Sequence, residues 1–346
     1  MSATVGAGAP GESKASKKMA SDRHLDDSTT QITVVIVTYN SADVIADLLL
    51  SLPDGFEGAN CAETIIVDNA SQDETLSMVV DLAPEATLIR MPRNAGYAAA
   101  INRAIHRARP SDAVLVLNAD VRLRAGAVHH LVQALADNQV GVAVPRLVDE
   151  SGTTSHSLRR RPTVGRAFGE AVLGGRLAGR FSPLGEVITD SGPYETAGAV
   201  DWASGAVWLV SRRCLEAVGD WDESFFLYCE ETDFALRAHD AGFKVWYVPD
   251  AIVEHIGGDA HHAPDLWALL TVNRVRLFWM LHRLVANAAY LAAIVLGTGA
   301  RAALGRRTDR RALAALVRWV RHREPPMEAG LVESSRELGQ SPQVRG

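Results

Sequence analysis

The sequence lacks several features that would assign it to a common class of protein. Its three cysteines, Cys61, Cys214 and Cys229, show neither a CxxC nor another metal-type spacing, so we expect no disulfide framework and a reducing compartment. Basic residues number 35 against 41 acidic residues, and the net charge of −6 argues against a general nucleic-acid binder. No phosphate-cradling P-loop is present, so bound phosphates would need another source of positive charge.

The length and composition predict one large α/β domain with tails, or two small domains. The 346 residues are 47% hydrophobic and 22% charged, which is enough to bury a sizeable core. Residues 1–30 and 324–346 have no periodic apolar face, and we expect both to be disordered tails because burial cannot offset their ordering entropy. The first tail has no apolar core, so we expect no signal peptide.

Strands and helices alternate between residues 32 and 136. The run ITVVIVT at 32–38 is typical of a parallel strand buried on both faces, and shorter strands are predicted at 63–67, 86–90 and 113–117. A helical pattern follows each of them, and Ser41 is expected to cap the first helix. The alternation predicts right-handed βαβ crossovers and a Rossmann-like, mostly parallel sheet flanked by helices.

Polar side chains gather where these strands end, and ligands of open α/β sheets bind at such ends. Tyr39 offers a stacking face, and Asp68 can accept a hydrogen bond from a base N–H or a ribose hydroxyl. A cap or turn role explains Asn94 equally well. The predicted nucleotide-binding residues are Thr38, Tyr39, Asn40, Asp68, Asn94 and Asn118.

Asp120 ends the segment AVLVLNAD at 113–120 and is the candidate metal ligand. Mg²⁺ typically uses one or two protein carboxylates together with substrate phosphates and water. One carboxylate beside the Asn118 amide therefore suits a Mg²⁺ or Mn²⁺ ion that arrives with a diphosphate. The alternative for Asp120 is a cap of the next helix.

Residues 225–234, FFLYCEETDF, form a second candidate centre. Acids are favoured at the positive end of a helix, which explains one or two of Glu230, Glu231 and Asp233. It does not explain the aromatic residues that precede them, which predict a partly desolvated pocket. Asp233 could also simply pair with Arg237, four residues on.

The segment between the two centres is basic and glycine-rich at 155–166 and 174–180. The consecutive arginines Arg159, Arg160 and Arg161 predict either a mobile lid that meets phosphates or a solvated loop. Further on, Trp202 is a candidate apolar platform for a sugar, whereas Trp208 is expected in the core.

Four motifs together resemble family 2 glycosyltransferases of the GT-A fold: VIVTYN at 35–40, IIVDNAS at 65–71, RNAGYAAAINRA at 93–104 and LVLNAD at 115–120. Within that family the sequence is most similar to bacterial rhamnosyltransferase-like enzymes of cell-wall and polysaccharide assembly. The resemblance covers about residues 32–258. It implies a catalytic domain at 31–260, with a nucleotide-sugar half at 31–145 and an acceptor half at 146–260.

The resemblance also implies roles for single residues. Thr38, Tyr39 and Asp68 would contact the nucleotide, and Asp120 would close a DxD-like metal motif in which Asn118 replaces the usual first aspartate. The general base would be Glu231, the second member of the acidic pair, with Glu230 and Asp233 in reserve. His255 matches a position that meets metal or diphosphate in related enzymes.

The predicted reaction is glycosyl transfer with inversion. One carboxylate takes the proton of the acceptor hydroxyl as that oxygen attacks the anomeric carbon, and a metal stabilises the leaving diphosphate. The resemblance favours L-rhamnose from dTDP-rhamnose and a glycan or polyprenyl-linked acceptor, with UDP-galactofuranose, a UDP-hexose or a GDP-sugar as alternative donors. A nucleotidyltransferase would need a basic glycine-rich loop where TYNSADV stands, and a non-catalytic sugar-nucleotide-binding protein would explain Asn118 and Glu231 as departures.

Residues 261–323 predict a C-terminal helical extension. The apolar run at 285–296 is shorter than the about 20 residues of a membrane span. Residues 301–323 carry eight arginines against one acid, with apolar residues at helical spacing. This pattern is typical of a basic amphipathic helix on a membrane surface, and we expect residues 274–323 to contact the inner face of the cell membrane. The alternative is a helical pair that caps the catalytic domain.

Overall fold

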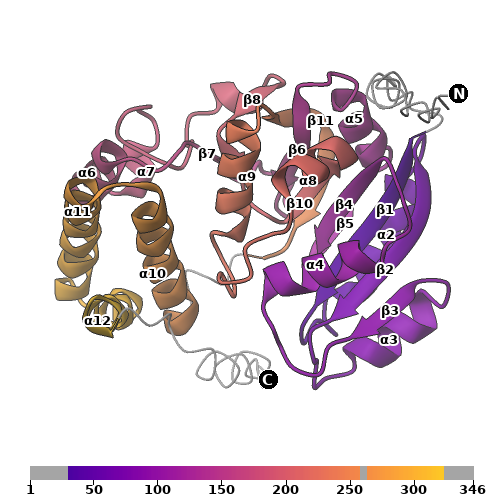
Figure 1. Cartoon of the computed structure of the whole chain (residues 1–346), viewed down its shortest axis with the longest axis horizontal. Coiled ribbons are helices and arrows are strands. Elements are labelled where there is room, and N and C mark those ends of the chain that lie inside the picture. Colours follow the sequence, from indigo (N-terminus) through magenta and orange to yellow (C-terminus); the bar gives the residue numbers. More distant parts are fainter. Residues whose placement is uncertain (1–29, 258–262, 323–346) are drawn as a thin grey trace, which may run out of the picture.

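The computed structural model describes residues 30–257 and 263–322 (Figure 1). The predicted tails, apart from Thr30, lie outside the described residues, as do Gly258, His261 and His262. One central sheet with helices on both faces forms the body of the molecule, and three helices near the C-terminus stand beside it (Figure 1).

The first half of the sheet is parallel, as the alternating pattern predicts. Its strands run from the edge inward in the order β3 (Thr87–Arg90), β2 (Asn60–Asp68), β1 (Gln31–Thr38) and β4 (Ala113–Asn118). All three pairings are parallel, so the carboxyl ends of the strands meet at one edge. Thr38 lies opposite Asp68 in this register.

The second half of the sheet is mixed. β10 (Val207–Ser211) runs antiparallel to both β4 and β6 (Val140–Val148). β6 pairs in parallel with β11 (Lys244–His255), to which β5 (Val121–Leu123) and β8 (Gly198–Val200) add as antiparallel neighbours. The predicted parallel character therefore belongs to the β3–β4 half, and the antiparallel β10 joins it to the rest.

Helices on the two faces enclose two apolar cores. Along β1, Val34 and Ile36 face one core, and Val35 and Val37 face the other, as strand geometry requires. The first core lies under α2 (Ile45–Gly55), α3 (Thr75–Leu82) and α5 (Ala127–Ala134). The second lies under α4 (Tyr97–Arg107), α8 (Arg212–Val218) and α9 (Glu230–Asp240).

The predicted helix cap at Ser41 is wrong. α2 begins at Ile45, and the Ser41 hydroxyl instead accepts the backbone N–H of Tyr39 at 3.2 Å. The loop after β1 is held by the loop after β2, since the N–H of Asn40 donates to Ser71 Oγ and that of Ser41 to Thr75 Oγ1. The helix starts later because these contacts fix a turn before it.

The C-terminal extension is helical, as predicted. It consists of α10 (Pro264–Leu281), α11 (Leu284–Ala303) and α12 (Arg307–His322), which share a core with Phe278, Tyr290 and Trp319. α6 (Val164–Leu173) packs on α11, where Gly297 lies against Ala171 (Figure 1). The extension is therefore attached to the segment that follows β7 (Leu158–Arg159).

Candidate active site

Asp68 organises the ends of β1 and β2. It is 1% exposed, its Oδ1 accepts the Thr38 hydroxyl at 3.1 Å and its Oδ2 accepts the Ser71 N–H at 3.0 Å. Each carboxylate oxygen can accept more than one hydrogen bond, so these contacts orient Asp68 without using all of its acceptor capacity. Thr38 and Asp68 therefore lie together at the strand edge, and nucleotide binding by them stays a prediction.

The remaining predicted nucleotide residues on this edge shape its loops. Asn40 has a φ of 48°, and its Oδ1 accepts the Gln72 N–H at 2.8 Å. Asn94 Oδ1 accepts the Gly96 N–H at 3.0 Å, which is the turn role that the sequence also allows. Tyr39, which immediately precedes Asn40, is half-buried and leaves part of its side chain open to a ligand.

Asn69 is a structural residue that sequence reasoning missed. Its side chain is buried, accepts the Ala95 N–H at 2.9 Å and donates to the Gly96 carbonyl at 3.0 Å. Asn69 thus fixes the start of α4 from the end of β2. The sequence suggests a function for its neighbour Asp68 but none for Asn69, because the hydrogen-bond partners of Asn69 are 26 and 27 residues away in the sequence.

Gly96 and Tyr97 join the strand edge to the 225–229 turn, the segment before α9. The Tyr97 N–H donates to the Phe226 carbonyl at 2.8 Å. Gly96 has a φ of 96°, and a Cβ there would lie 2.5 Å from the same carbonyl oxygen. Glycine is therefore required at position 96 both by its backbone conformation and by this approach.

Tyr97 is the second residue that sequence reasoning missed. Its hydroxyl donates to Asn118 Oδ1 at 2.6 Å. Burial raises the pKa of Tyr97 well above its ordinary value, and the charges of Glu230, Asp120 and Glu231 raise it further. The phenol is therefore protonated at neutral pH, and it stands under the influence of both candidate centres.

Asp120 and His255 lie together, as the predicted metal site requires. Asp120 Oδ1 is 3.4 Å from His255 Nε2, and both side chains are partly exposed. α5 begins at Ala127 with Gly126 before it, so Asp120 does not cap that helix. A Cβ at Gly257 would lie 2.3 Å from Asp120 Oδ2, so glycine keeps the space beside the carboxylate open.

This pair fits a divalent cation that shares its ligands with a substrate. No group of three or more His, Cys, Asp or Glu side chains that could hold a metal occurs among residues 30–257 and 263–322. One carboxylate and one imidazole leave most of a coordination sphere to phosphate oxygens and water, which is how Mg²⁺ is usually bound. The donor set thus suits Mg²⁺ or Mn²⁺ accompanied by a diphosphate.

Glu230 and Glu231, the acid pair, follow a strained turn. Tyr228 and Cys229 have φ values of 68° and 74°, in the left-handed region that non-glycine residues rarely adopt. Asn273 of α10 is fully buried and donates to the carbonyls of Leu227 and Tyr228 at 2.9 and 3.2 Å. Such strain persists only where surrounding contacts hold it.

The two glutamates differ in environment. Glu230 is 4% exposed, and burial together with the charge of Glu231 raises its pKa well above the ordinary value. Burial raises the pKa of Glu231 to about 7. Each has a buried Oε2 without a hydrogen-bond partner. Glu230 therefore holds its proton more tightly than a free glutamate does, whereas Glu231 is poised between its two forms near neutral pH, which suits a general base.

Glu231 is half-buried beside the 204–205 turn. An added Cβ at Gly205 would lie 3.5 Å from Glu231 Cβ and 3.8 Å from its carboxyl carbon, so the 204–205 turn lies against it. Asp233 instead binds Arg237 at 2.7 Å. Asp233 therefore forms the ion pair with Arg237 that the sequence also allows.

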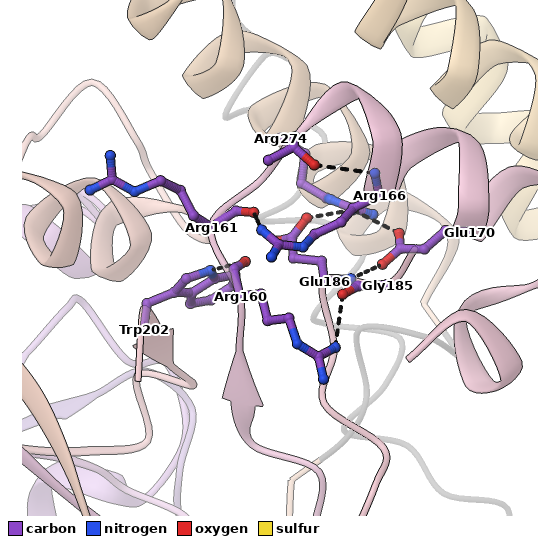
Figure 2. Close-up of polar contacts among 9 residues, drawn as sticks. Arg160, Arg161, Arg166, Glu170, Gly185, Glu186, Trp202 and Arg274 are labelled. Atoms are coloured by element: carbon purple, nitrogen blue, oxygen red, sulfur yellow. Dashed lines mark hydrogen bonds and ion pairs between the residues drawn. The ribbon is translucent and has the colours of Figure 1, made fainter. Parts of the chain in front are cut away.

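Trp202 is more deeply buried than an open platform would be. It belongs to β9 (Trp202–Ala203), is 9% exposed and donates its indole N–H to the Arg160 carbonyl at 3.1 Å (Figure 2). The Arg159 guanidinium carbon lies 5.8 Å from its ring centre. Only an edge of the ring is open, and contact with a sugar stays a prediction. Trp208 is in the core, as predicted.

Comparison with known proteins identifies the family of this chain. The model of glycosyl transferase family 2 matches residues 33–191. The N-acetylglucosaminyl-diphospho-decaprenol L-rhamnosyltransferase of Mycobacterium tuberculosis is 30% identical over 238 residues, covering 66% of this chain and 76% of the relative. The rhamnosyltransferase WbbL of Escherichia coli is 25% identical over 171 residues, covering 49% and 60%.

Solved structures share the fold. The mannosyltransferase PcManGT of Pyrobaculum calidifontis, in complex with GDP-Man and Mn²⁺, aligns with a TM-score of 0.52 and 20% identity over 93% of this chain and 84% of its own. GalNAc-T7 with UDP, GalNAc and Mn²⁺ gives 0.53 and 15% identity over 73% and 49%. The architecture is that of a glycosyltransferase with the GT-A fold. The chain belongs to glycosyltransferase family 2 and is rhamnosyltransferase-like.

Proposed function

We propose that this glycosyltransferase moves L-rhamnose from dTDP-rhamnose to a hydroxyl of a diphosphate-linked polyprenyl acceptor, with inversion at the anomeric carbon. Two similar proteins are named as rhamnosyltransferases, and the name of one specifies an acceptor on diphospho-decaprenol. The observation that carries the mechanism is the juxtaposition of Asp120 and His255 with an acid pair whose buried carboxyl groups have raised pKa values.

Each side of the site has a separate task in this proposal. On the donor side, Asp120 and His255 would hold Mg²⁺ or Mn²⁺, which when bound supplies positive charge to the leaving diphosphate. On the acceptor side, Glu231 accepts the proton of the acceptor hydroxyl as that oxygen forms its bond to the anomeric carbon. The bond from that carbon to the diphosphate breaks at the same time, on the opposite face of the sugar.

Tyr97 supports the donor side without exchanging a proton. Its phenol is held protonated by burial and by the nearby carboxylates, and its hydrogen bond fixes the Asn118 side chain two residues before Asp120. Asn118, which stands where many members of the family have aspartate, is thereby positioned as a neutral neighbour of the metal ligand. One carboxylate and one imidazole therefore form the protein's share of the cation site in this proposal.

The deciding experiment is a transfer assay over dTDP-, UDP- and GDP-sugars, with and without Mn²⁺. We expect nucleotide release and glycan formation with dTDP-rhamnose, lost in Asp120→Asn and reduced by about 100-fold or more in Glu231→Gln, because a positioned base contributes about 10²–10⁴-fold. Glu216→Gln, an exposed acid on α8, is the matched control and should keep full activity. Full activity in Asp120→Asn or Glu231→Gln would refute the assignment, and transfer of another sugar would replace the donor.

We also propose that the enzyme works as a peripheral protein on the cytoplasmic face of the cell membrane. Residues 263–322 carry ten arginines against Asp265 and Asp309, and Leu284, Val285 and Leu304 are exposed. Within the described ranges, α11 is the one helix long and apolar enough to cross a membrane. Its Tyr290, Ala293 and Ile294 are buried against neighbouring helices, which favours attachment to the surface over crossing.

A further inference from the structure

The three consecutive arginines after residue 158 have different surroundings. Arg161 is exposed and approaches Asp240 only at 4.0 Å. Arg160 donates through Nη1 to the Gly179 carbonyl at 3.1 Å and so ties its loop together. The same Nη1 donates to the Gly185 carbonyl at 3.0 Å (Figure 2). The half-buried Arg159 donates through Nη1 to two backbone carbonyls nearby in its own chain segment. Among the described residues no carboxylate lies within 4.0 Å of it.

Arg159 stands beside the candidate base. It lies opposite Trp202 in the β7–β9 pair, with its guanidinium over that ring. Three residues after Trp202, Gly205 lies so close to Glu231 that an added Cβ would stand 3.5 Å from the Glu231 Cβ. The positive charge of Arg159 also lowers the pKa of Glu231, against the larger effect of burial. This arrangement puts an unpaired cation on the acceptor side of the site.

Two of the acids that act on Arg159 from further away are already bound by another arginine. Arg274 of α10 binds Glu170 at 3.0 Å and Glu186 at 2.9 Å, as Figure 2 shows. Burial raises the pKa of Glu186, which weakens it as a counter-charge. Arg159 is therefore a partly desolvated guanidinium that has backbone carbonyls but no carboxylate as partner among the described residues, an arrangement that is costly unless an anion completes it.

We propose that Arg159 binds a phosphate group of the diphosphate-linked acceptor and so seats that acceptor beside Glu231. A guanidinium presents paired N–H donors that match phosphate oxygens in a bidentate arrangement, and an aromatic ring beneath it holds the fork in place. The inference rests on the proposed function. The donor diphosphate carries the same chemistry, but its place in that proposal is at Asp120 and His255.

The test compares Arg159→Gln and Arg159→Lys with Arg161→Gln, an exposed neighbour, as the control. The probes are a short-chain N-acetylglucosaminyl diphospholipid, a neutral octyl N-acetylglucosaminide and dTDP with Mn²⁺. Calorimetry measures the binding of each probe, and the transfer assay gives KM. For the diphospholipid we expect Arg159→Gln to raise Kd and KM about 10- to 100-fold, from the about 1.5–3 kcal/mol of a charged hydrogen bond. Arg159→Lys should give a smaller loss.

The other two probes separate the possible outcomes. Binding of dTDP and of the neutral glycoside should change less than about twofold, and Arg161→Gln should resemble the wild type. Weaker dTDP binding in Arg159→Gln would reassign the residue to the donor phosphates, and unchanged diphospholipid binding would overturn the proposal. If the wild type binds the diphospholipid through Arg159 but transfers no sugar to it, the proposed function fails while the anion site stands.

Discussion

At the scale of single residues, the two adjacent glutamates at the start of α9 are expected to behave differently. Glu231 has a pKa of about 7, so kcat/KM should rise with pH through one ionisation near that value. Burial and the charge of Glu231 raise the pKa of Glu230 and favour its protonated form, which glutamine resembles in shape, so Glu230→Gln should keep most of the activity. Glu231→Gln should lose both the activity and the ionisation. A pH–rate profile of the three proteins measures this.

Stability supplies an independent check of the same prediction. Burial raises the pKa of Glu231 from 4.5 to about 7, so the folded protein binds more protons than the unfolded chain between these values. The contribution of Glu231 to the free energy of unfolding is therefore full below pH 4.5 and is lost as the pH rises through about 7. Urea titrations should show a weaker pH dependence in Glu231→Gln. An unchanged dependence would mean that Glu231 is not buried as described.

Sequence reasoning found the residues whose chemistry is visible in their type, and missed those defined by distant contacts. The sequence motifs suggest Asp120 and His255 as partners, and the fold brings them within 3.4 Å although strands β5 to β10 lie between them in the sequence. Tyr97 was part of a quoted motif, yet its partners, Asn118 and Phe226, are 21 and 129 residues away. No local pattern shows that an aromatic residue at the start of a helix will reach a strand end.

At the scale of elements, α10 holds the 225–229 turn through Asn273. Asn273→Leu would leave the carbonyls of Leu227 and Tyr228 without their donor, at a cost of about 1–3 kcal/mol in stability. Because that turn delivers Glu231, we expect kcat to fall by about 10- to 100-fold. The Kd for dTDP should stay unchanged, since the donor side is not touched. Steady-state kinetics and calorimetry measure the two effects.

Asn287 provides the matched control for this prediction. It is a buried asparagine of α11 that also donates to two carbonyls, those of Trp279 and His282, but it does not contact the turn. Asn287→Leu should lower the melting temperature similarly and leave kcat as in the wild type. Equal losses of kcat in both variants would show that general destabilisation explains the effect.

Strands and helices could be predicted from the sequence wherever one hydrophobic periodicity dominated. The β-branched runs of β1 and β4 and the apolar spacing of α4 identify them without tertiary information. β6 has no counterpart among the predicted strands, and nothing in the composition of β10 reveals that it runs antiparallel to β4. Strand direction depends on the path of the connecting chain. Here 58 residues, 149–206, separate β6 from β10, and much of that segment is irregular.

At the scale of the whole molecule, charge is unevenly distributed, since the net charge is −6 although residues 263–322 are strongly basic. We expect binding to vesicles that contain anionic lipid, weakening as salt rises. Replacing the exposed Arg307, Arg318 and Arg321 with glutamine should weaken binding about 100-fold, at about 1 kcal/mol for each charge. Sedimentation with vesicles at several salt concentrations measures this.

The control for vesicle binding removes the same number of positive charges from residues outside the C-terminal extension. Arg90, Arg103 and Arg107 are exposed on β3 and α4, far from the extension in sequence, and their replacement by glutamine should leave binding nearly unchanged. Equal weakening by the two triple variants would show that net charge matters and that the extension is not the contact surface.

The contact between Gly96 and Phe226 has a consequence for how such an enzyme can be altered. It is made by backbone atoms on both sides, so it fixes the path of the chain and leaves the side chain of Phe226 unconstrained by this bond. Under the proposed function, substitutions within residues 225–228 should therefore change acceptor preference while this backbone contact is kept. A chimera of two family members should exchange this turn whole, because a shift of its path would press against a position that admits no Cβ.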